Sequence, residues 1–159
     1  MSDPTSFGGQ VIEQSSTDRT DYRFPLAIFN SIVAKNVDVS ISFKSVAGRV
    51  DQAGGIAVRV LDADNYYVVR ANALEDNVRF YRLVKGRREQ IDGANTKVAG
   101  NVWHKLGLKA DGERFTIKFD GKILFTTSDK TFAGAGKIAL WTKADSITRF
   151  DQISIEVLP

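Results

Sequence analysis

A group of polar and aromatic side chains falls on matching positions of successive strand-like segments. Side chains two residues apart in a strand share one face of its sheet. On this parity the segments at residues 55–61, 66–72 and 77–85 can present one common face, joined by residues near position 141. The candidate set on that face is Arg59, Arg70, Asn72, Tyr81, Trp141 and Lys143.

These residue types suit the recognition of a carbohydrate. An aromatic ring covers the apolar C–H face of a pyranose, while guanidinium and ammonium groups donate to hydroxyl, ring or carboxylate oxygens. We therefore expect Trp141 to stack on a sugar and Arg59, Arg70 and Lys143 to donate to its oxygens, with Asn72 both donating and accepting. The alternative is that the arginines pair with acidic residues and that Trp141 belongs to the core. One β-bulge would change the parity on which this prediction depends.

Carboxylates offer two further candidate sites. Glu75, Asp76 and Asp145 are the candidates for catalysis by a small carbohydrate-active enzyme, although a solvated hairpin is the preferred interpretation of the first two. The turn at residues 62–65, Asp-Ala-Asp-Asn, has oxygens that could hold calcium, but it lacks the glutamate and the spacing of an EF-hand loop. Asp and Asn are ordinary residues of tight turns, which is the preferred interpretation. Calcium bound by distant loops stays open as an alternative, and no other cofactor is predicted.

The histidine and the basic residues favour ordinary roles. His104 is the single histidine and cysteine is absent, so a transition-metal site or a Ser-His-Asp triad has almost no material, and we expect a surface or packing role. If Trp103 points into the core, His104 points away from it. Residues 79–88 mix basic and aromatic side chains, a pattern typical of nucleic-acid binding. Flanking acidic residues offset that charge, so we expect a solvated hairpin and no nucleic-acid partner, with a polyanionic glycan as the alternative.

The composition is that of one globular domain. Hydrophobic residues make up 43% and charged residues 26% of the 159 positions, and the net charge of +3 is too small to indicate a partner. No apolar run approaches the roughly 20 residues that cross a bilayer, so no membrane span is expected. The first ten residues carry no cationic and apolar leader pattern, so no signal peptide is expected.

The dominant hydrophobic period is two, which predicts an all-β protein. Residues 37–44, 115–119 and 153–157 alternate apolar and polar side chains, and Asp-Gly pairs at 111–112 and 120–121 predict hairpins. Further strand-like runs lie at residues 9–13, 23–29, 55–61, 66–72, 77–85, 102–110, 123–127 and 137–142. No convincing helix of three turns is seen. The pattern favours a two-sheet antiparallel β-sandwich of the jelly-roll kind, as one domain over residues 1–159 in which residues 1–8 are expected to be disordered.

The strand that starts at Trp103-His104, its Asp-Gly turn and the following alternating strand resemble the concanavalin A-like and laminin-G-like jelly-roll family. A closer resemblance, carried by residues 51–56, 64–72 and 140–146, is to bacterial domains of unknown function that are called family 16 glycosidase-like or 3-keto-disaccharide hydrolase-like. The resemblance implies a jelly roll, a periplasmic or secreted setting and a carbohydrate context. It does not imply hydrolysis, because the paired-glutamate strand of family 16 enzymes has no counterpart here.

We therefore predict a non-catalytic, lectin-like carbohydrate-binding module of a bacterial extracytoplasmic protein. Two alternatives stay open because one fold hosts many functions. The first is a small carbohydrate-active enzyme of the keto-disaccharide hydrolase-like kind. The second is a structural or protein-interaction domain, for which the sequence names no partner.

Overall fold

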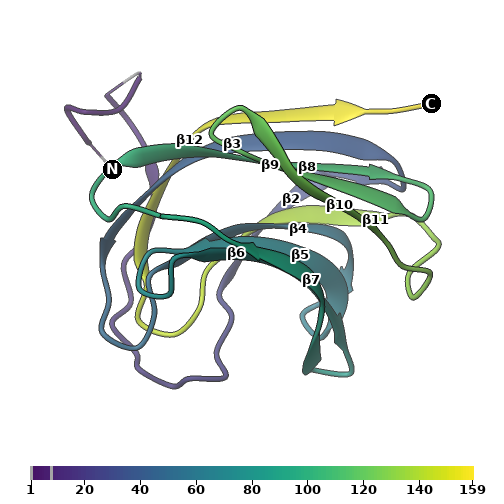
Figure 1. Cartoon of the computed structure of the whole chain (residues 1–159), viewed down its shortest axis with the longest axis horizontal. Coiled ribbons are helices and arrows are strands. Elements are labelled where there is room, and N and C mark those ends of the chain that lie inside the picture. Colours follow the sequence, from purple (N-terminus) through teal and green to yellow (C-terminus); the bar gives the residue numbers. More distant parts are fainter. Residues whose placement is uncertain (1, 8) are drawn as a thin grey trace.

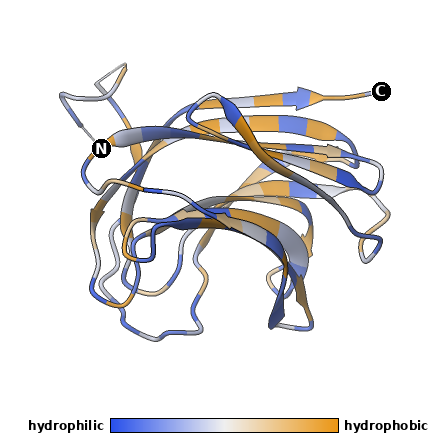
Figure 2. Ribbon diagram, in the orientation of Figure 1, coloured by the Kyte–Doolittle hydropathy of each residue, from blue (hydrophilic) through white to orange (hydrophobic). Residues whose placement is uncertain are grey.

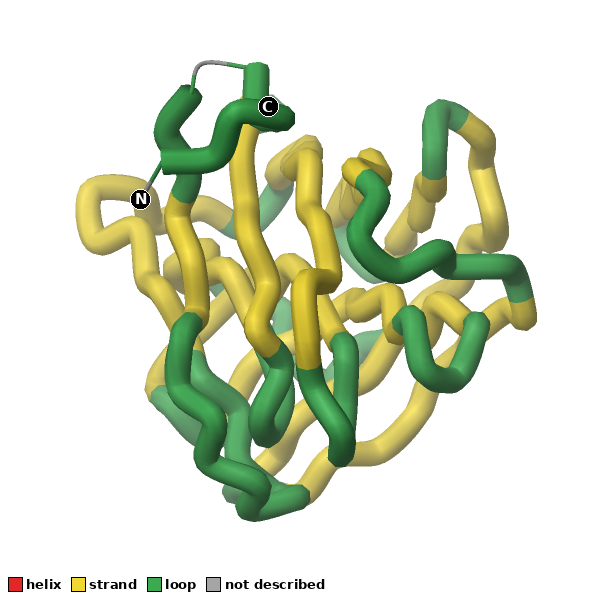
Figure 3. Tube along the Cα trace, turned by 90° about the vertical axis from the view of Figure 1, so that its left-hand side faces the viewer, coloured by secondary structure: helices red, strands yellow, loops and turns green. Residues whose placement is uncertain are grey.

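The computed structural model describes residues 2–7 and 9–159, and this part of the chain folds into strands joined by loops. Figure 3 shows the strands and loops and no helix among these residues. Within the described chain, no helix is long and apolar enough to cross a membrane. Of residues 1–8, which were expected to be disordered, positions 1 and 8 lie outside the described residues. Asp3 is buried, and its carboxylate accepts from Lys44 (2.8 Å) and Arg149 (2.7 Å).

The strands form two six-stranded antiparallel sheets, which confirms the predicted sandwich. In spatial order, the first sheet contains β1 (Ile12–Gln14), β12 (Ile147–Val157), β3 (Val37–Ala47), β8 (Trp103–Asp111), β9 (Arg114–Phe119) and β10 (Lys122–Ser128). The second contains β2 (Leu26–Ala34), β11 (Gly136–Trp141), β4 (Ala53–Asp62), β5 (Asn65–Asn72), β6 (Asn77–Val84) and β7 (Arg87–Asn95). Figure 1 shows the sheets as two layers, with the second sheet arched so that its outer face is concave.

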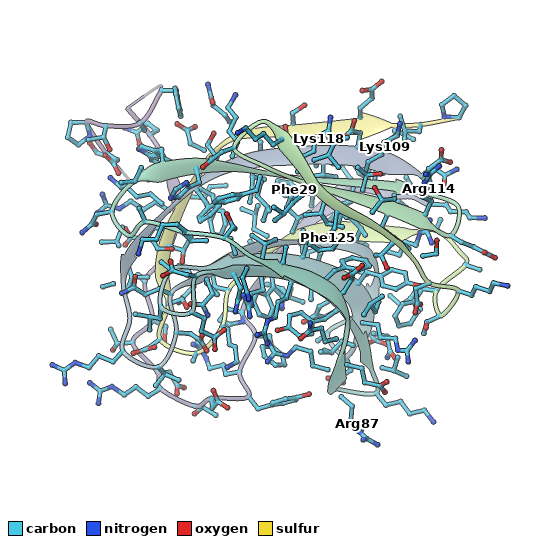
Figure 4. The ribbon with its side chains drawn as sticks, viewed as in Figure 1. Phe29, Arg87, Lys109, Arg114, Lys118 and Phe125 are labelled. Atoms are coloured by element: carbon cyan, nitrogen blue, oxygen red, sulfur yellow. The ribbon has the colours of Figure 1, made fainter. Side chains whose placement is uncertain are left out.

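The main hydrophobic core lies between the two sheets. Because neighbouring side chains of a strand alternate between faces, each strand sends every second residue inward, and the ribbons in Figure 2 accordingly alternate in hydropathy. Figure 4 shows Phe29 and Phe125 pointing into this space. Fully buried members of the core include Ile41, Phe43, Ile56, Val58, Tyr67, Val69, Phe80, Leu106, Leu108, Phe115 and Ile117.

Turn chemistry explains how the predicted hairpins close. The Asp120-Gly121 pair joins β9 to β10 with positive φ angles at both residues (47° and 84°), the geometry of a tight two-residue turn. The strand boundaries differ from the prediction at several places. Strand β12 begins six residues earlier than expected, and β7 was not predicted as a strand because its sequence is mostly polar.

Candidate functional site

The outer surface of the second sheet, which we call the concave face, carries a second group of buried side chains. Residues paired across antiparallel strands share a face, so the register places Tyr81 beside Val68 and Gln90, and Leu83 beside Tyr66 and Arg88. The predicted parity of β5 and β6 is confirmed. The concave face comprises Ala57, Val60, Tyr66, Val68, Arg70, Asn72, Arg79, Tyr81, Leu83, Arg88, Gln90, Gly93, Ala139 and Trp141.

Arg70 lies on the concave face near the end of β5 that turns into β6, and it is 2% exposed. Its Nη2 donates to Oε2 of Glu75 (3.0 Å) and to the hydroxyl of Tyr81 (3.1 Å), while Nη1 donates to the side-chain oxygen of Asn77. Burial lowers the pKa of Arg70, and the charge of Glu75 and the hydroxyl of Tyr81 oppose that shift. The guanidinium is thus held rigidly, and Glu75 remains half-exposed beside it.

Tyr81 forms the aromatic centre of the same surface. The Arg88 guanidinium carbon lies 4.3 Å from the centre of its ring, and that of Arg70 lies 5.7 Å away. The same Arg88 group lies 5.4 Å from the ring of Phe24, which belongs to the loop before β2. Tyr22 of this loop accepts a hydrogen bond from the backbone N–H of Arg88. The loop therefore packs across part of the concave face.

Trp141 is fully buried beneath this loop. The ring of Phe24 stacks on it at 5.4 Å between centres, and its Nε1 donates to the hydroxyl of Tyr66 (3.0 Å). Burial raises the pKa of Tyr66 to about 12, so this hydroxyl stays protonated. Trp141 lies on the predicted face, but Phe24 occupies the position where a stacked sugar was expected. The indole therefore forms the floor of the site.

Asn72 and Lys143 lie at one margin of the concave face and are held by internal partners. The Lys143 ammonium donates to Asp51 (2.6 Å) and to Asp21 (2.7 Å), and Asn72 donates to the other oxygen of Asp51. The Asn72 oxygen accepts from the backbone N–H of Leu74 (2.9 Å). Burial lowers the pKa of Lys143, but the hydrogen bonds to the two aspartates outweigh it and raise the pKa overall. These contacts fasten the loops that border the site.

Arg59 does not share this face, and its predicted place in the groove is corrected. Strand β4 has a register irregularity between Val58 and Asp62, and Arg59 adopts a φ of 50°, so Val60 takes the concave side instead. The Arg59 side chain turns toward one end of the core and donates to the carbonyls of Lys35 (3.0 Å), Phe132 (2.8 Å) and Gly112 (2.6 Å). This bulge moves Arg59 off the face that strict alternation along β4 predicted for it.

The three carboxylates considered for catalysis are engaged separately. Glu75 pairs with Arg70, while Asp76 accepts from the backbone N–H of Val98 (2.9 Å) and pairs with Lys97 (3.3 Å). Asp145 is buried and accepts from three successive backbone N–H groups, those of residues 49–51, at 2.8–3.1 Å. Burial raises the pKa of Asp145, but these hydrogen bonds outweigh it and lower the pKa overall. Asp145 therefore holds the β3–β4 loop.

The histidine and the acidic turn have local structural roles. His104 is buried, stacks on Phe119 with 5.1 Å between ring centres, and bonds to Asp120 (2.8 Å). Trp103 instead turns outward, opposite to the orientation supposed for it, while the packing role of His104 agrees with expectation. In the acidic turn, the Asp62 carboxylate accepts from the Asp64 N–H (2.8 Å), as in an ordinary tight turn. Among the described residues, no three His, Cys, Asp or Glu side chains are placed to hold a metal ion.

A separate groove of about 300 Å³ opens between the edges of the two sheets, near β1 and β2. Its lining combines apolar side chains, among them Leu26, Leu140 and Phe150, with the polar residues 13–16 and Thr142. The buried hydroxyl of Thr142 has no hydrogen-bond partner among the described residues. The described residues that line this groove include no arginine or lysine, whereas the concave face offers guanidinium groups beside a carboxylate and an amide for sugar oxygens. The concave face is therefore the stronger candidate site.

Sequence reasoning missed several residues of the concave face. Tyr22 lies in a loop without periodicity, and Phe24 falls in the run 23–29 that was predicted as a strand, whereas β2 begins at Leu26. Gln90 lies in β7, which was not predicted as a strand. Arg88 was noted only for its charge. The Lys85-Gly86 pair is the sequence signal that could have placed Arg88, because a glycine favours a tight two-residue turn. Both residues have positive φ (51° and 77°), and the turn returns the chain as the hairpin partner of β6.

Comparison with known proteins places these observations in context. Residues 24–158 match the family described as "Galactocerebrosidase, C-terminal lectin domain". A levanase of Bacillus subtilis (strain 168) is 27% identical over 96 residues, which are 60% of this chain, and the match spans 14% of the levanase.

Solved structures show the same fold. The carbohydrate-binding module CBM66 from Bacillus subtilis superimposes with a TM-score of 0.81 at 22% identity, covering 91% of this chain and 85% of the module. A Bacillus subtilis protein of unknown function with a galectin-like fold gives 0.71 at 9% identity, covering 95% and 84%. CG-16, a homodimeric agglutinin from chicken liver, gives 0.62 at 10% identity, covering 84% and 100%.

Proposed function

The chain belongs to the family of galactocerebrosidase C-terminal lectin domains, and we propose that it binds its carbohydrate on the concave face, around Arg70 and Tyr81. It is a lectin-type carbohydrate-binding module related to a bacterial levanase. One observation supports this location above others. A nearly fully buried guanidinium, held by Glu75, Asn77 and Tyr81, lies on the arched sheet beside a half-exposed carboxylate.

Each side chain around Arg70 has a defined part in the proposed binding. Glu75 is half-exposed and accepts from sugar hydroxyls, while Gln90 is exposed and can both donate and accept. Asn72 and Lys143 hold the margin of the site through Asp51, and Trp141 supports it from below. Arg59 takes no part.

We propose that binding proceeds without catalysis. Hydrolysis of a glycoside generally needs two carboxyl groups acting together, whereas Glu75, Asp76 and Asp145 have separate structural partners. Since the chain matches only 14% of the levanase, its place within a longer glycoside-acting protein is part of the proposal. The periplasmic or secreted setting that the family 16-like resemblance implied stays a prediction, as does the keto-disaccharide hydrolase-like alternative.

The test is isothermal titration of the 159-residue chain with a panel of polysaccharides that includes levan, with circular dichroism to verify folding. Two variants change exposed groups of the concave face, Glu75→Gln and Gln90→Ala. The matched control is Lys109→Ala, because Lys109 points outward from the first sheet (Figure 4). We expect binding that both concave-face variants weaken and the control leaves unchanged.

Other outcomes contradict parts of the proposal. A sugar that binds equally well to both concave-face variants would place the site elsewhere, for example at the groove near β1 and β2. Turnover of a disaccharide or keto-disaccharide that is lost in Asp145→Asn would support the enzyme alternative. A folded chain that binds no glycan of the panel would refute carbohydrate binding and leave the protein-interaction alternative.

A further inference from the structure

Three arginines share the concave face with Tyr81. Arg70 and Arg79 are directly opposite each other in the register of β5 and β6, an arrangement in which like charges repel. The third, Arg88, comes from β7, and its guanidinium carbon lies over the ring of Tyr81, 4.3 Å from its centre. The sheet thus brings three positive charges to one face. Glu75, which pairs with Arg70, is the carboxylate in direct contact with them among the described residues.

Two of these cations have no acidic partner. Among residues 2–7 and 9–159, the guanidinium groups of Arg79 and Arg88 make no hydrogen bond or ion pair, and Nη1 of Arg88 is buried without an acceptor. The pKa of Asp21 is lowered mainly by its hydrogen bond to Lys143, and the charge of Arg88 adds a smaller contribution. The Asp21 carboxylate is thus bonded to Lys143 and makes no hydrogen bond to Arg88. A buried charged donor without an acceptor is costly, and the described residues place no carboxylate against Arg79 or Arg88 to offset their charge.

We infer that the concave face takes a sugar residue that carries an anionic group, the carboxylate of a uronic acid or a sulfate ester. This inference rests on the proposed function, since it specifies the ligand of the same site. A guanidinium binds a carboxylate or sulfate through parallel N–H···O bonds, and the side chains of Arg79 and Arg88 are both partly exposed on this face. The hydroxyls of the same sugar residue would bond to Glu75 and Gln90.

The burial of the rings argues against a nucleic acid as the anion. Stacking of bases needs exposed aromatic faces, but Tyr81 is only 5% exposed and lies under Arg88. Phe24 is likewise in contact with Trp141 and with the Arg88 guanidinium. What remains accessible is polar and charged, as suits a hydroxyl-rich anionic ligand.

The experiment compares matched ligands by isothermal titration of the 159-residue chain at low salt and at about 0.5 M salt. One ligand is an oligogalacturonide, the second is the same oligosaccharide with its carboxyl groups reduced, and the third is a sulfated neutral oligosaccharide. Levan oligosaccharides serve as a neutral reference. We expect one of the two anionic classes to bind about ten-fold tighter than its neutral counterpart, and the difference to shrink in high salt.

Three variants locate the preference. Arg79→Gln and Arg88→Gln each reduce the ratio of acidic to neutral affinity, whereas Arg88→Lys retains part of it because the charge remains. Arg79 is more accessible than Arg70, so its variant should fold even if a change at Arg88 disturbs the loop over Phe24. The control is Arg114→Gln, at the outward-facing arginine of the first sheet (Figure 4).

The outcomes separate this inference from the proposed function. If neutral levan or the reduced oligosaccharide binds as tightly as the acids, and Glu75→Gln still weakens it, the inference is overturned while the concave-face lectin stands. If the acidic preference persists in both arginine variants and falls in Arg114→Gln, the anion binds to the first sheet and the inference fails. If the folded chain binds none of these glycans, the proposed function fails as well.

Discussion

Replacing Arg59 by methionine should reduce stability without reducing sugar affinity. The Arg59 side chain is 1% exposed and donates to the backbone carbonyls of Lys35, Gly112 and Phe132, which belong to three separate loops. Methionine retains much of the volume beside Tyr67 but leaves these three acceptors without a donor. At about 1–2 kcal/mol for each buried acceptor, less the cost of burying the guanidinium in the wild type, the expected loss is about 3 kcal/mol.

The assay is urea unfolding followed by tryptophan fluorescence, together with a thermal melt. In a chain of this length a loss of 3 kcal/mol should lower the melting temperature by roughly 6–12 °C. Arg59→Lys should lose nearly as much, because one ammonium cannot span the carbonyls of three loops in the way a guanidinium fork does. Arg114→Met, at an exposed position of β9, is the control and should change stability by less than about 0.5 kcal/mol.

Two results would refute this reasoning. A folded Arg59→Met protein with unchanged unfolding midpoint would mean that water satisfies the three carbonyls and that Arg59 is not a brace. Loss of glycan binding at temperatures where the variant is fully folded would return Arg59 to the binding site, as the sequence pattern had suggested, and would weaken the assignment of the concave face.

Three further predictions concern the frame of the site. Gly136→Ala should destabilise the chain by about 2 kcal/mol in urea unfolding, because its Cβ would lie 2.4 Å from the carbonyl carbon of Arg59; a neutral result would show that the bulge in β4 can shift. Asp145→Asn should cost about 1–3 kcal/mol near neutral pH. The pKa of Asp145 is lowered from its ordinary value of 3.8, so its carboxylate stabilises the fold above that pH and loses this contribution as the pH falls below it. The stability difference between wild type and Asp145→Asn should therefore shrink in acid. Urea unfolding midpoints of both proteins at about pH 7 and about pH 2.5 test this direction. Trp141→Phe should cost about 1–3 kcal/mol while leaving glycan affinity within about three-fold, because Phe24 separates the indole from any ligand; titration and melting of the same sample check both.

Sequence periodicity predicts those parts of the fold that bury one face. Strands such as β3 and β9 alternate because their inner side chains fill the core between the sheets, and the Asp-Gly turns on either side of β9 fix its register with β8 and β10. The same logic placed Arg70, Asn72 and Tyr81 on one surface correctly. It failed at Arg59 because a bulge depends on a partner far along the chain: the backbone of Gly136 packs against that of Arg59, and no local pattern records this contact.

The candidate site was hardest to predict where it is most exposed. Strand β7 lies at the edge of the second sheet and most of its residues are polar or half-exposed, so it has no hydrophobic alternation to detect. Yet β7 supplies Arg88, and the irregular loop before β2 supplies Phe24, and these two side chains decide what the Tyr81 surface offers to a ligand. A core needs only apolar groups at a regular spacing, whereas a binding surface needs particular charges left without internal partners. That property depends on how three strands and a loop meet, and so it becomes visible only when the contacts of each guanidinium are known.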